Sequence, residues 1–197
     1  EEGAPHGTLV VADRQDSGKG RRGRAWIVPA GIAIAMSIVL KPQELLPEHA
    51  PQLTLVAALA VARAIEQQTG LPVQIKWPND IVIDGKKMCG ILTEMSTQID
   101  YINHIVVGIG INVHNEQFPE ELSDRATSLY LSSGGRRYSR AALVEAVCEQ
   151  FEYFYGIFMQ TQDMSGLKEV YDDCLVNRGR TVRILDPKGE YEGVAQG

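Results

Sequence analysis

Long apolar runs, paired cysteines and metal-binding clusters are all missing from this sequence of 197 residues. No stretch reaches the roughly 18 uninterrupted apolar residues that a membrane-spanning helix requires, and the N-terminus has no basic segment followed by an apolar one. The three cysteines, Cys89, Cys148 and Cys174, are odd in number and lack metal-ligand spacing. We therefore expect reduced, buried thiols in a soluble cytoplasmic protein.

Positive charge is also scarce. The sequence has 19 Lys and Arg residues against 25 Asp and Glu, which gives a net charge of −6 and a pI near 5.3. This balance argues against a general nucleic-acid-binding or anionic-membrane-binding surface. No motif offers a Ser/His/Asp arrangement or paired catalytic carboxylates, so a hydrolase mechanism has no support. The length and the 44% apolar content fit one full globular domain with a real core.

The apolar pattern predicts an α+β fold in which a mixed, largely antiparallel sheet is backed by helices. Two apolar runs, Thr8–Asp13 and Ala33–Leu40, are typical of buried strands. Four more strands follow at close spacing, and they must be antiparallel neighbours because parallel pairing needs a long crossover. Asp84 and Gly85 mark a two-residue hairpin turn between two of them. The four strands are expected at Val73–Trp77, Ile81–Ile83, Met88–Met95 and Ile102–Val113.

Helices are expected both before and after this strand-rich region in the sequence. Pro51–Thr69 places apolar residues at steps of three and four, with proline suited to the first turn and Gly70 suited to the C-terminal cap. Ser139 is a good N-cap for a helix that reaches about Met159, whose apolar stripe indicates core packing. A shorter helix is expected at Gly166–Val176. The apolar stripe consists of Leu143, Val147, Phe151, Phe154 and Phe158.

The last residues of the sequence predict a β-hairpin. Its strands are expected at Thr181–Leu185 and Glu190–Val194, joined by a turn over Asp186–Gly189. An isolated hairpin cannot bury its own apolar side chains. We therefore expect residues 1–178 to form one domain and residues 179–197 to begin a second, small β domain.

The stretch Asp13–Trp26, called the Gly/Arg loop below, concentrates glycine and positive charge. It holds five of the 19 Lys and Arg residues and three glycines, and we expect it to lie in a long loop without regular structure. Three interpretations stay open: a disordered nucleic-acid-binding arm, a solvated loop, or a phosphate cradle of backbone amides and guanidinium groups. No helix follows, so it is neither a Rossmann nor a P-loop fingerprint. These residues are Arg14, Gly18, Lys19, Gly20, Arg21, Arg22, Gly23 and Arg24.

Three further clusters combine turn residues, cations and glycines. Lys76–Asp80 (K-W-P-N-D) breaks a strand at proline, and its Asn and Asp suit an ordinary turn as well as a site. Lys86 and Lys87 follow the hairpin turn, so alternation directs one to each face, and Gly90 leaves room beside them for a ligand. Gly108–Asn112 (G-I-G-I-N) leaves one strand face without side chains, which fits a bulge, close packing or a flat floor for a ligand.

In their order and spacing these four clusters resemble the biotin–protein ligases. The family motifs are G-R-G-R-R-G-R followed by Trp, K-W-P-N-D, Lys-x-x-Gly-Ile-Leu and G-x-G-x-N. They correspond here to Gly18–Arg24, Lys76–Asp80, Lys87–Leu92 and Gly108–Asn112. Lys19 stands in place of the first motif arginine, which keeps the charge but loses the planar fork. The match covers nearly the whole sequence.

The resemblance implies a fold and domain boundaries. The family fold is a mixed sheet backed by helices with a small C-terminal β-barrel, so Thr181–Val194 would be the opening hairpin of that barrel. Residues 1–178 would be the biotin- and ATP-binding catalytic domain, and residues 179–197 the beginning of a truncated barrel domain. The family's Ser-Thr-Asn biotin contact lies upstream of the first strand, so we expect the N-terminal part of the catalytic domain to be missing from this sequence.

The resemblance also implies a two-step reaction. Biotin and Mg·ATP give biotinyl-5′-AMP and pyrophosphate, and the biotinyl group then passes to a lysine of a biotin carboxyl carrier protein. We therefore expect biotin, ATP and Mg²⁺ as ligands, with a homodimer as a further assembly. The alternatives are a lipoate-type ligase, a biotin-responsive repressor if the native chain carries an N-terminal helix-turn-helix, and a non-catalytic homodimer module.

Site residues follow by position from the resemblance. Lys87 and Arg21 would be catalytic, because bringing a carboxylate to a phosphate requires positive charge and positioning. Asp80 would help with Mg²⁺ or with the acceptor lysine. We expect the Gly/Arg loop to be mobile when empty and ordered by its ligand, since fixing glycines is entropically unfavourable. The expected ATP contacts are Arg21, Arg24, Trp26, Asn79, Lys87 and Asn112. The expected biotin contacts are Gln15, Gly18, Lys19, Gly20, Arg21, Lys87, Gly90, Gly108 and Gly110.

Overall fold

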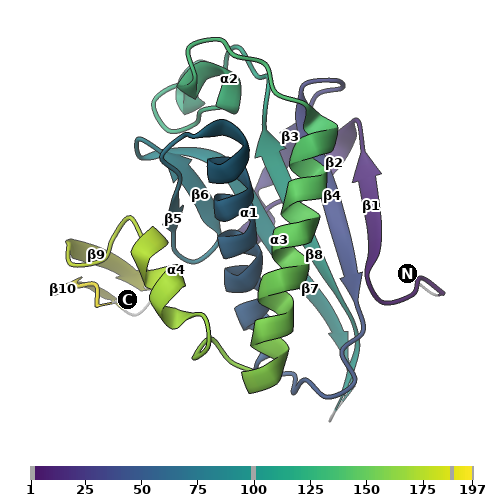
Figure 1. Ribbon diagram of the computed structural model, residues 1–197. Coiled ribbons are helices and arrows are strands. Elements are labelled where there is room, and N and C mark those ends of the chain that lie inside the picture. The colour runs from purple at the N-terminus through teal and green to yellow at the C-terminus, as the bar shows by residue number, and fades with distance from the viewer. Residues whose placement is uncertain (1–2, 99–100, 187–188, 197) are drawn as a thin grey trace.

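The computed structural model describes residues 3–98, 101–186 and 189–196, and its largest element is a six-stranded sheet. The strand order is β1-β4-β8-β7-β6-β5, and every neighbouring pair is antiparallel (Figure 1). The predicted α+β fold with a largely antiparallel sheet is therefore confirmed. The strands are β1 Thr8–Ala12, β4 Ala33–Leu40, β5 Gln74–Lys76, β6 Asp80–Ile83, β7 Lys86–Thr97 and β8 Ile102–Asn112.

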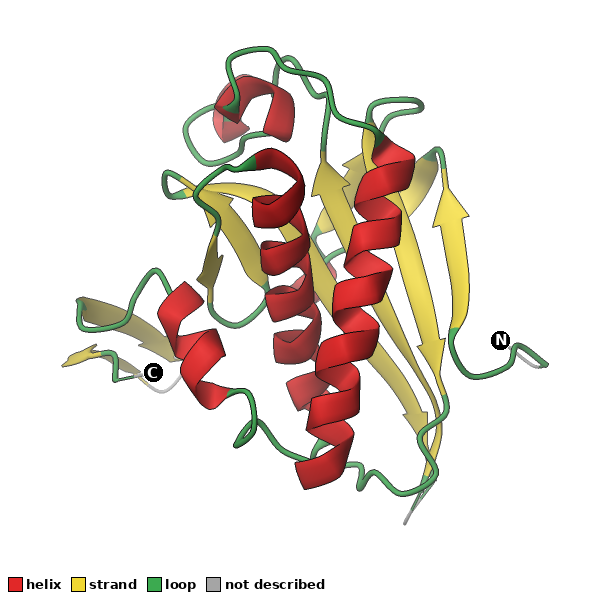
Figure 2. Cartoon of the chain, viewed as in Figure 1, coloured by secondary structure: helices red, strands yellow, loops and turns green. Residues whose placement is uncertain are grey.

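Two long helices lie side by side on one face of this sheet, as Figure 2 shows in red. The first ends where Gly70 adopts a φ of 71°, and the second begins where the Ser139 side chain accepts a hydrogen bond from the backbone N–H of Ala142. Both predicted caps are confirmed. The helices are α1 Leu53–Thr69, α2 Leu129–Ser132, α3 Arg140–Thr161 and α4 Lys168–Cys174, with 3₁₀ turns at Arg21–Gly23, Ala50–Gln52 and Glu120–Leu122.

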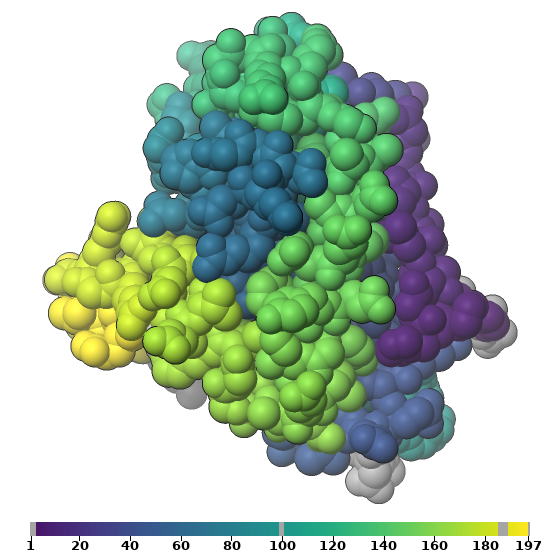
Figure 3. Space-filling model, viewed as in Figure 1, coloured from purple at the N-terminus to yellow at the C-terminus, as the bar shows by residue number. Residues whose placement is uncertain are grey.

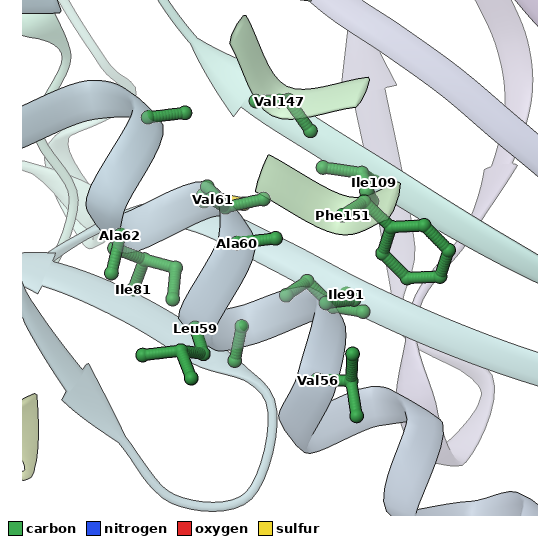
Figure 4. Close-up of a cluster of buried hydrophobic side chains, with 14 of the residues drawn as sticks. Val56, Leu59, Ala60, Val61, Ala62, Ile81, Ile91, Ile109, Val147 and Phe151 are labelled. Atoms are coloured by element: carbon green, nitrogen blue, oxygen red, sulfur yellow. The ribbon is translucent and has the colours of Figure 1, made fainter. Parts of the chain in front are cut away.

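The main core fills the space between the two long helices and the sheet. Helix α1 is rich in alanine, and ten of its residues are buried, so its backbone can lie close to the strands. Figure 4 shows its side chains together with Ile91 of β7, Ile109 of β8 and Phe151 of α3. The predicted apolar stripe of α3 is confirmed. Its five residues, Leu143, Val147, Phe151, Phe154 and Phe158, are all buried.

The Gly/Arg loop is not the structureless connection that its composition predicts. Residues Gln15–Lys19 (β2) and Ala25–Val28 (β3) pair as an antiparallel hairpin around the 3₁₀ turn Arg21–Gly23. Local sequence patterns missed the hairpin because its strands are short and rich in glycine and charge. In β8, by contrast, the pairing runs without a register shift across Gly108–Asn112 with β4 and across Gly108–Ile111 with β7, so that segment contains no bulge.

The predicted C-terminal hairpin is also present. Strands β9 (Thr181–Asp186) and β10 (Gly189–Val194) form a separate two-stranded sheet, which projects from the body at the yellow end of the chain in Figure 3. The turn joining them was predicted at Asp186–Gly189, and residues 187 and 188 of it lie outside the described part of the chain. The β-barrel beyond this hairpin stays a prediction. In the described ranges, no helix combines the length and apolarity needed to cross a membrane.

The buried stripe of α3 predicts which of its residues support the fold. Phe158 is fully buried, so Phe158→Ala should lower the free energy of unfolding by about 3–5 kcal/mol, through lost burial and the cavity left behind. Tyr153 on the same helix is 63% exposed, so Tyr153→Ala serves as the control. It should change the free energy of unfolding by no more than about 0.5 kcal/mol. Urea unfolding followed by circular dichroism measures both. A Phe158→Ala loss below about 1 kcal/mol would contradict this packing.

Candidate active site

A row of residues with small or no side chains crosses the sheet on the face opposite α1 and α3. Strand pairing aligns Ala12 of β1, Ala35 of β4, Gly110 of β8 and Gly90 of β7, and the row ends at Asp80 of β6. Because paired residues in neighbouring strands point to the same face, these positions form a shallow trough at right angles to the strands.

Trp26 of β3 lies directly on this trough. A Cβ added to Gly110 would lie 2.3 Å from the indole Nε1 of Trp26, and one added to Gly90 would lie 3.3 Å from its ring. The indole N–H is buried and has no hydrogen-bond partner. Next to Trp26, Val28 packs with Ala35 in a small apolar cluster. The predicted strand face without side chains is therefore present, but the side chain of Trp26 covers part of it.

Gly108 lies on the same face of β8 as Gly110, two residues before it and beyond the part of the trough that Trp26 covers. A Cβ added there would have its nearest neighbours at ordinary contact distances, 3.4 Å to the backbone oxygen of Leu92 and 3.9 Å to the hydroxyl of Ser37. The protein itself therefore leaves space above Gly108. This open position, rather than Gly110, is where the trough can accept an external group.

A β-bulge brings Lys87 to the same face as the trough. Ile81 pairs with Cys89 but Val82 pairs with Lys87, so β7 contains one extra residue at this point. Without that residue Lys87 would point into the helix-covered core, because side chains alternate along a strand. Instead its ammonium lies 2.6 Å from the Asp80 carboxylate and 5.4 Å from the centroid of the Trp26 ring. Simple alternation predicted that one lysine turns inward but missed this bulge.

The β2–β3 hairpin carries Arg21 to the end of the same site. Gly18 is essential to the hairpin geometry, since a Cβ there would lie 2.1 Å from the carbonyl oxygen of Trp26. Arg22 and Gly23 turn the chain with φ values of 58° and 73°. The guanidinium of Arg21 then donates a hydrogen bond to the side-chain oxygen of Asn79, at 3.2 Å. Residues 58 positions apart are thereby joined across the site.

One predicted amide side chain, that of Asn112, lines the other end. Asn112 is buried, and its Nδ2 donates to the carbonyl oxygen of Thr127 at 3.1 Å. The backbone of Lys87 pairs with the same segment, accepting from Thr127 N–H at 2.9 Å and donating to the Arg125 carbonyl at 2.8 Å. The segment 125–127 therefore supports Lys87, a role that no local pattern in its sequence indicates.

The base of the Gly/Arg loop is held by a residue that sequence reasoning also missed. Arg140, at the start of α3, lies 2.8 Å from the carboxylate of Asp13 and donates to the Ala33 carbonyl at 3.0 Å. Asp13 also accepts from the backbone N–H of Gly31. The hydrogen bond from Arg140 is the main reason that the pKa of Asp13 is lowered. A single guanidinium thus links the start of the loop and the start of β4 to α3.

The remaining predicted site residues lie on the hairpin surface. Lys19 and Arg24 are exposed, and the side-chain oxygen of Gln15 packs beside Gly18, 2.8 Å from where its Cβ would be. Gly20 donates to the carbonyl of Arg24 and closes the hairpin end. The structure therefore gathers Arg21, Trp26, Asn79, Asp80, Lys87, Gly90, Gly108, Gly110 and Asn112 around the trough, and leaves Lys19 and Arg24 at its outer side.

A cleft of about 400 Å³ continues from Arg21 along the open side of β7. It begins beside the Trp77–Pro78 pair and runs past Thr93 to Met95. Apart from Arg21 its wall is uncharged, which suits an apolar segment of a ligand or of another protein. Its lining also includes Ala50, Pro51, Gln52, Thr54, Leu55, Ile91 and Leu92.

The chemistry available at this site is electrostatic. Burial raises the pKa of the Cys89 thiol far above its ordinary value, so this neighbour of Lys87 is not an activated nucleophile. In the described residues no three His, Cys, Asp or Glu side chains are placed to hold a metal ion. What the site offers is two cations, Lys87 and Arg21, beside a bare stretch of strand, an arrangement that can bring a carboxylate and a phosphate together.

Comparison with known proteins agrees with this arrangement. The family model described as "Biotin/lipoate A/B protein ligase family" matches residues 1–112. The curated "Bifunctional ligase/repressor BirA" of Bacillus spizizenii is 42% identical over 98% of this chain, which spans 59% of that relative. The "Biotin--[acetyl-CoA-carboxylase] ligase" of Paracoccus denitrificans is 43% identical over 53% of this chain and 43% of its own length.

A solved structure shows the same fold. The biotin protein ligase from Aquifex aeolicus in complex with biotin and ATP superposes with a TM-score of 0.84 at 33% identity, covering 98% of this chain and 78% of that one. The present chain thus spans about three fifths of the first curated relatives and over three quarters of this structure. The chain belongs to the biotin/lipoate A/B protein ligase family, and within it to the biotin–protein ligases.

Proposed function

We propose that this protein is an ATP-dependent biotin–protein ligase. The observation that carries the proposal is the convergence of Lys87 and Arg21 on one side-chain-free trough, from segments that lie more than 60 residues apart. Two anionic reactants need two cations between them, and a thin fused ring needs a floor without side chains. The names of the relatives and the biotin and ATP in the Aquifex aeolicus structure support the same assignment.

The first step is adenylation of biotin. A carboxylate oxygen of biotin attacks the α-phosphorus of ATP, the bond to the β-phosphate oxygen breaks, and pyrophosphate leaves. Lys87 and Arg21 reduce the repulsion between the two anions and stabilise the charge on the α-phosphate. Lys87 must exchange its bond to Asp80 for the incoming anion. A single carboxylate, that of Asp80, is too few ligands to hold Mg²⁺ by itself. Mg²⁺ would therefore enter as part of the Mg·ATP substrate, and Asp80 could share the ion with the phosphates.

The second step transfers the biotinyl group to an acceptor lysine. The neutral amine attacks the acyl carbon, AMP leaves with both bonding electrons, the nitrogen gives one proton to solvent, and an amide forms. The names of two relatives support acetyl-CoA carboxylase as the acceptor complex, and we propose its biotin carboxyl carrier protein as the partner. Asn112, Asn79, Arg24 and Trp26 are proposed on the nucleotide side and Gln15, Gly18, Lys19 and Gly20 on the biotin side.

Assembly and domain division are part of the same proposal. β6 pairs with β7 only as far as Gly90, so β7 beyond Ile91 has no partner strand on that side within the described residues. Such an edge can add a strand from another protein, and we propose it for homodimer formation. The separate β9–β10 sheet supports a boundary near residue 178, with residues 1–178 as the catalytic domain and 179–197 as the start of a β-barrel domain.

The two cations give the first functional prediction. Lys87→Ala and Arg21→Ala should each lower the rate of biotin-dependent pyrophosphate release from ATP by a factor on the order of 100–1000, because each removes a charge that stabilises the transition state. Asn103→Ala, an amide on β8 that donates to Ser96, is the control and should keep the parent rate. Full activity in both cation variants would reject the site assignment. Pyrophosphate release with lipoate but not with biotin would reject biotin as the substrate.

The two glycines of β8 give a second, paired prediction. Gly108→Ala has room in the protein, so the fold should be unaffected, but its methyl group enters the ligand space and should raise the KM for biotin about tenfold. Gly110→Ala collides with Trp26, so it should also shift tryptophan emission as the indole is displaced. Gly193→Ala on β10, where nothing lies within 4 Å, is the control. A Gly108→Ala protein with the parent's KM for biotin would show that Gly108 does not line the part of the trough that binds biotin.

A further inference from the structure

Asn79 uses both ends of its side-chain amide inside the protein. Its Nδ2 donates to the carbonyl oxygen of Ile91 at 3.0 Å, and its Oδ1 accepts from Arg21 at 3.2 Å. The backbone carbonyl of Asn79 also accepts from Ile91 N–H at 2.9 Å. This residue is therefore bonded to β7 at two points and to the β2–β3 hairpin at a third.

The contact with Ile91 determines which end of the amide faces the hairpin. A backbone carbonyl can only accept, so the group facing it must be the Nδ2. The Oδ1 is then left to face the hairpin, where the guanidinium of Arg21 can only donate. Asparagine satisfies both partners at once. Aspartate would place an oxygen against the Ile91 carbonyl, and alanine would leave both partners without a bond.

The neutral charge of Asn79 suits a contact that is kept while Arg21 also binds a phosphate, since the bond uses only Nη1 of a guanidinium that has five N–H donors. Lys87 is already paired with the carboxylate of Asp80, whereas Arg21 is held by an uncharged acceptor. The positive charge of Arg21 is thereby oriented but not neutralised, and it stays available to a phosphate, which forms stronger charge-assisted bonds.

Arg21 has little else to hold it in place. All three residues of its 3₁₀ turn are exposed, and none contributes to the core. Across the residues that the structure describes, the bond to Asn79 is the side-chain hydrogen bond that Arg21 makes. The hairpin is otherwise attached to the sheet on this side by Trp26 over Gly110 and Gly90. Loss of the Asn79 bond therefore frees the end of the hairpin that closes the site.

We propose that Asn79 is a positioning residue that latches Arg21, and with it the β2–β3 hairpin, over the site, so that biotinyl-AMP is retained until the acceptor arrives. The identity of the retained ligand rests on the proposed function. This assigns the Asn79 amide primarily to the protein's own hairpin and only secondarily to the nucleotide.

In the test, the protein is first loaded with labelled biotinyl-AMP. Excess unlabelled biotinyl-AMP is then added, and the dissociation rate of the labelled ligand is measured. Asn79→Ala should release it about tenfold faster than the parent, as expected for one lost hydrogen bond to a charged group. Arg21→Ala removes the same bond from an exposed residue that has no part in the core, which guards against a folding defect in Asn79→Ala. Arg21→Ala removes the shared bond and also the proposed phosphate contact of Arg21, so it should be at least as fast as Asn79→Ala, and adding Asn79→Ala to it should accelerate release no further. Asn103→Ala again serves as the control and should retain the ligand.

A second readout separates positioning from direct nucleotide binding. Asn79→Ala should raise the rate of biotinyl-AMP release by a larger factor than it raises the KM for ATP, because the proposed loss is mainly in closure of the hairpin and only secondarily in ATP contacts. A tenfold or larger rise in the KM for ATP with unchanged biotinyl-AMP release would overturn the latch. So would a double variant that releases the ligand about tenfold faster than Arg21→Ala alone, since independent sites add in free energy.

The latch can also be tested without any ligand. Trypsin should cleave the empty Asn79→Ala protein after Arg21–Arg24 several times faster than the empty parent, and equal cleavage rates would overturn the latch. If the parent neither forms nor binds biotinyl-AMP, the proposed function fails, and the cleavage comparison still decides the latch on its own.

Discussion

The indole of Trp26 rests on the bare backbone of β8, and the rest of the site depends on that contact. It requires glycine on both sides: Gly110 because a methyl group would overlap the ring, and Gly18 because β2 passes too close to the Trp26 carbonyl on β3 for any side chain. Two glycines 92 positions apart thus allow one hairpin to lie flat on one sheet. Close packing of this kind tolerates almost no added volume.

Around that contact the charge of the protein is locally reversed. The chain as a whole is acidic, with a net charge of −6, yet five of its 19 cationic residues lie in the Gly/Arg loop and Lys87 lies beneath it. An anion approaching the molecule meets a small positive area on a negative body. Such an arrangement favours small anions over polyanions, which would meet repulsion beyond the edges of the site.

Much of the fold could be predicted because its signals are local. The Ser139 cap, the Gly70 terminator, the Asp84–Gly85 turn and the stripe through Phe158 depend on residues a few positions apart. The features that escaped prediction are formed by distant residues. The bulge before Cys89, the bonds from residues 125–127 to Lys87 and the anchoring of Asp13 by Arg140 leave no periodic pattern in the sequence. The resemblance indicated the candidate site residues, but only the strand pairing shows how they meet.

The trough of Ala12, Ala35, Gly110 and Gly90 has a consequence for changing the substrate range of such an enzyme. Its depth is determined by four strands, β1, β4, β7 and β8, that span more than 100 residues of the chain, whereas its cover comes from one short hairpin. A designer who wants a bulkier ring accepted would therefore leave the sheet alone and rebuild the hairpin. A different Gly/Arg loop can be introduced over this unchanged floor by replacing one short, continuous segment of the sequence.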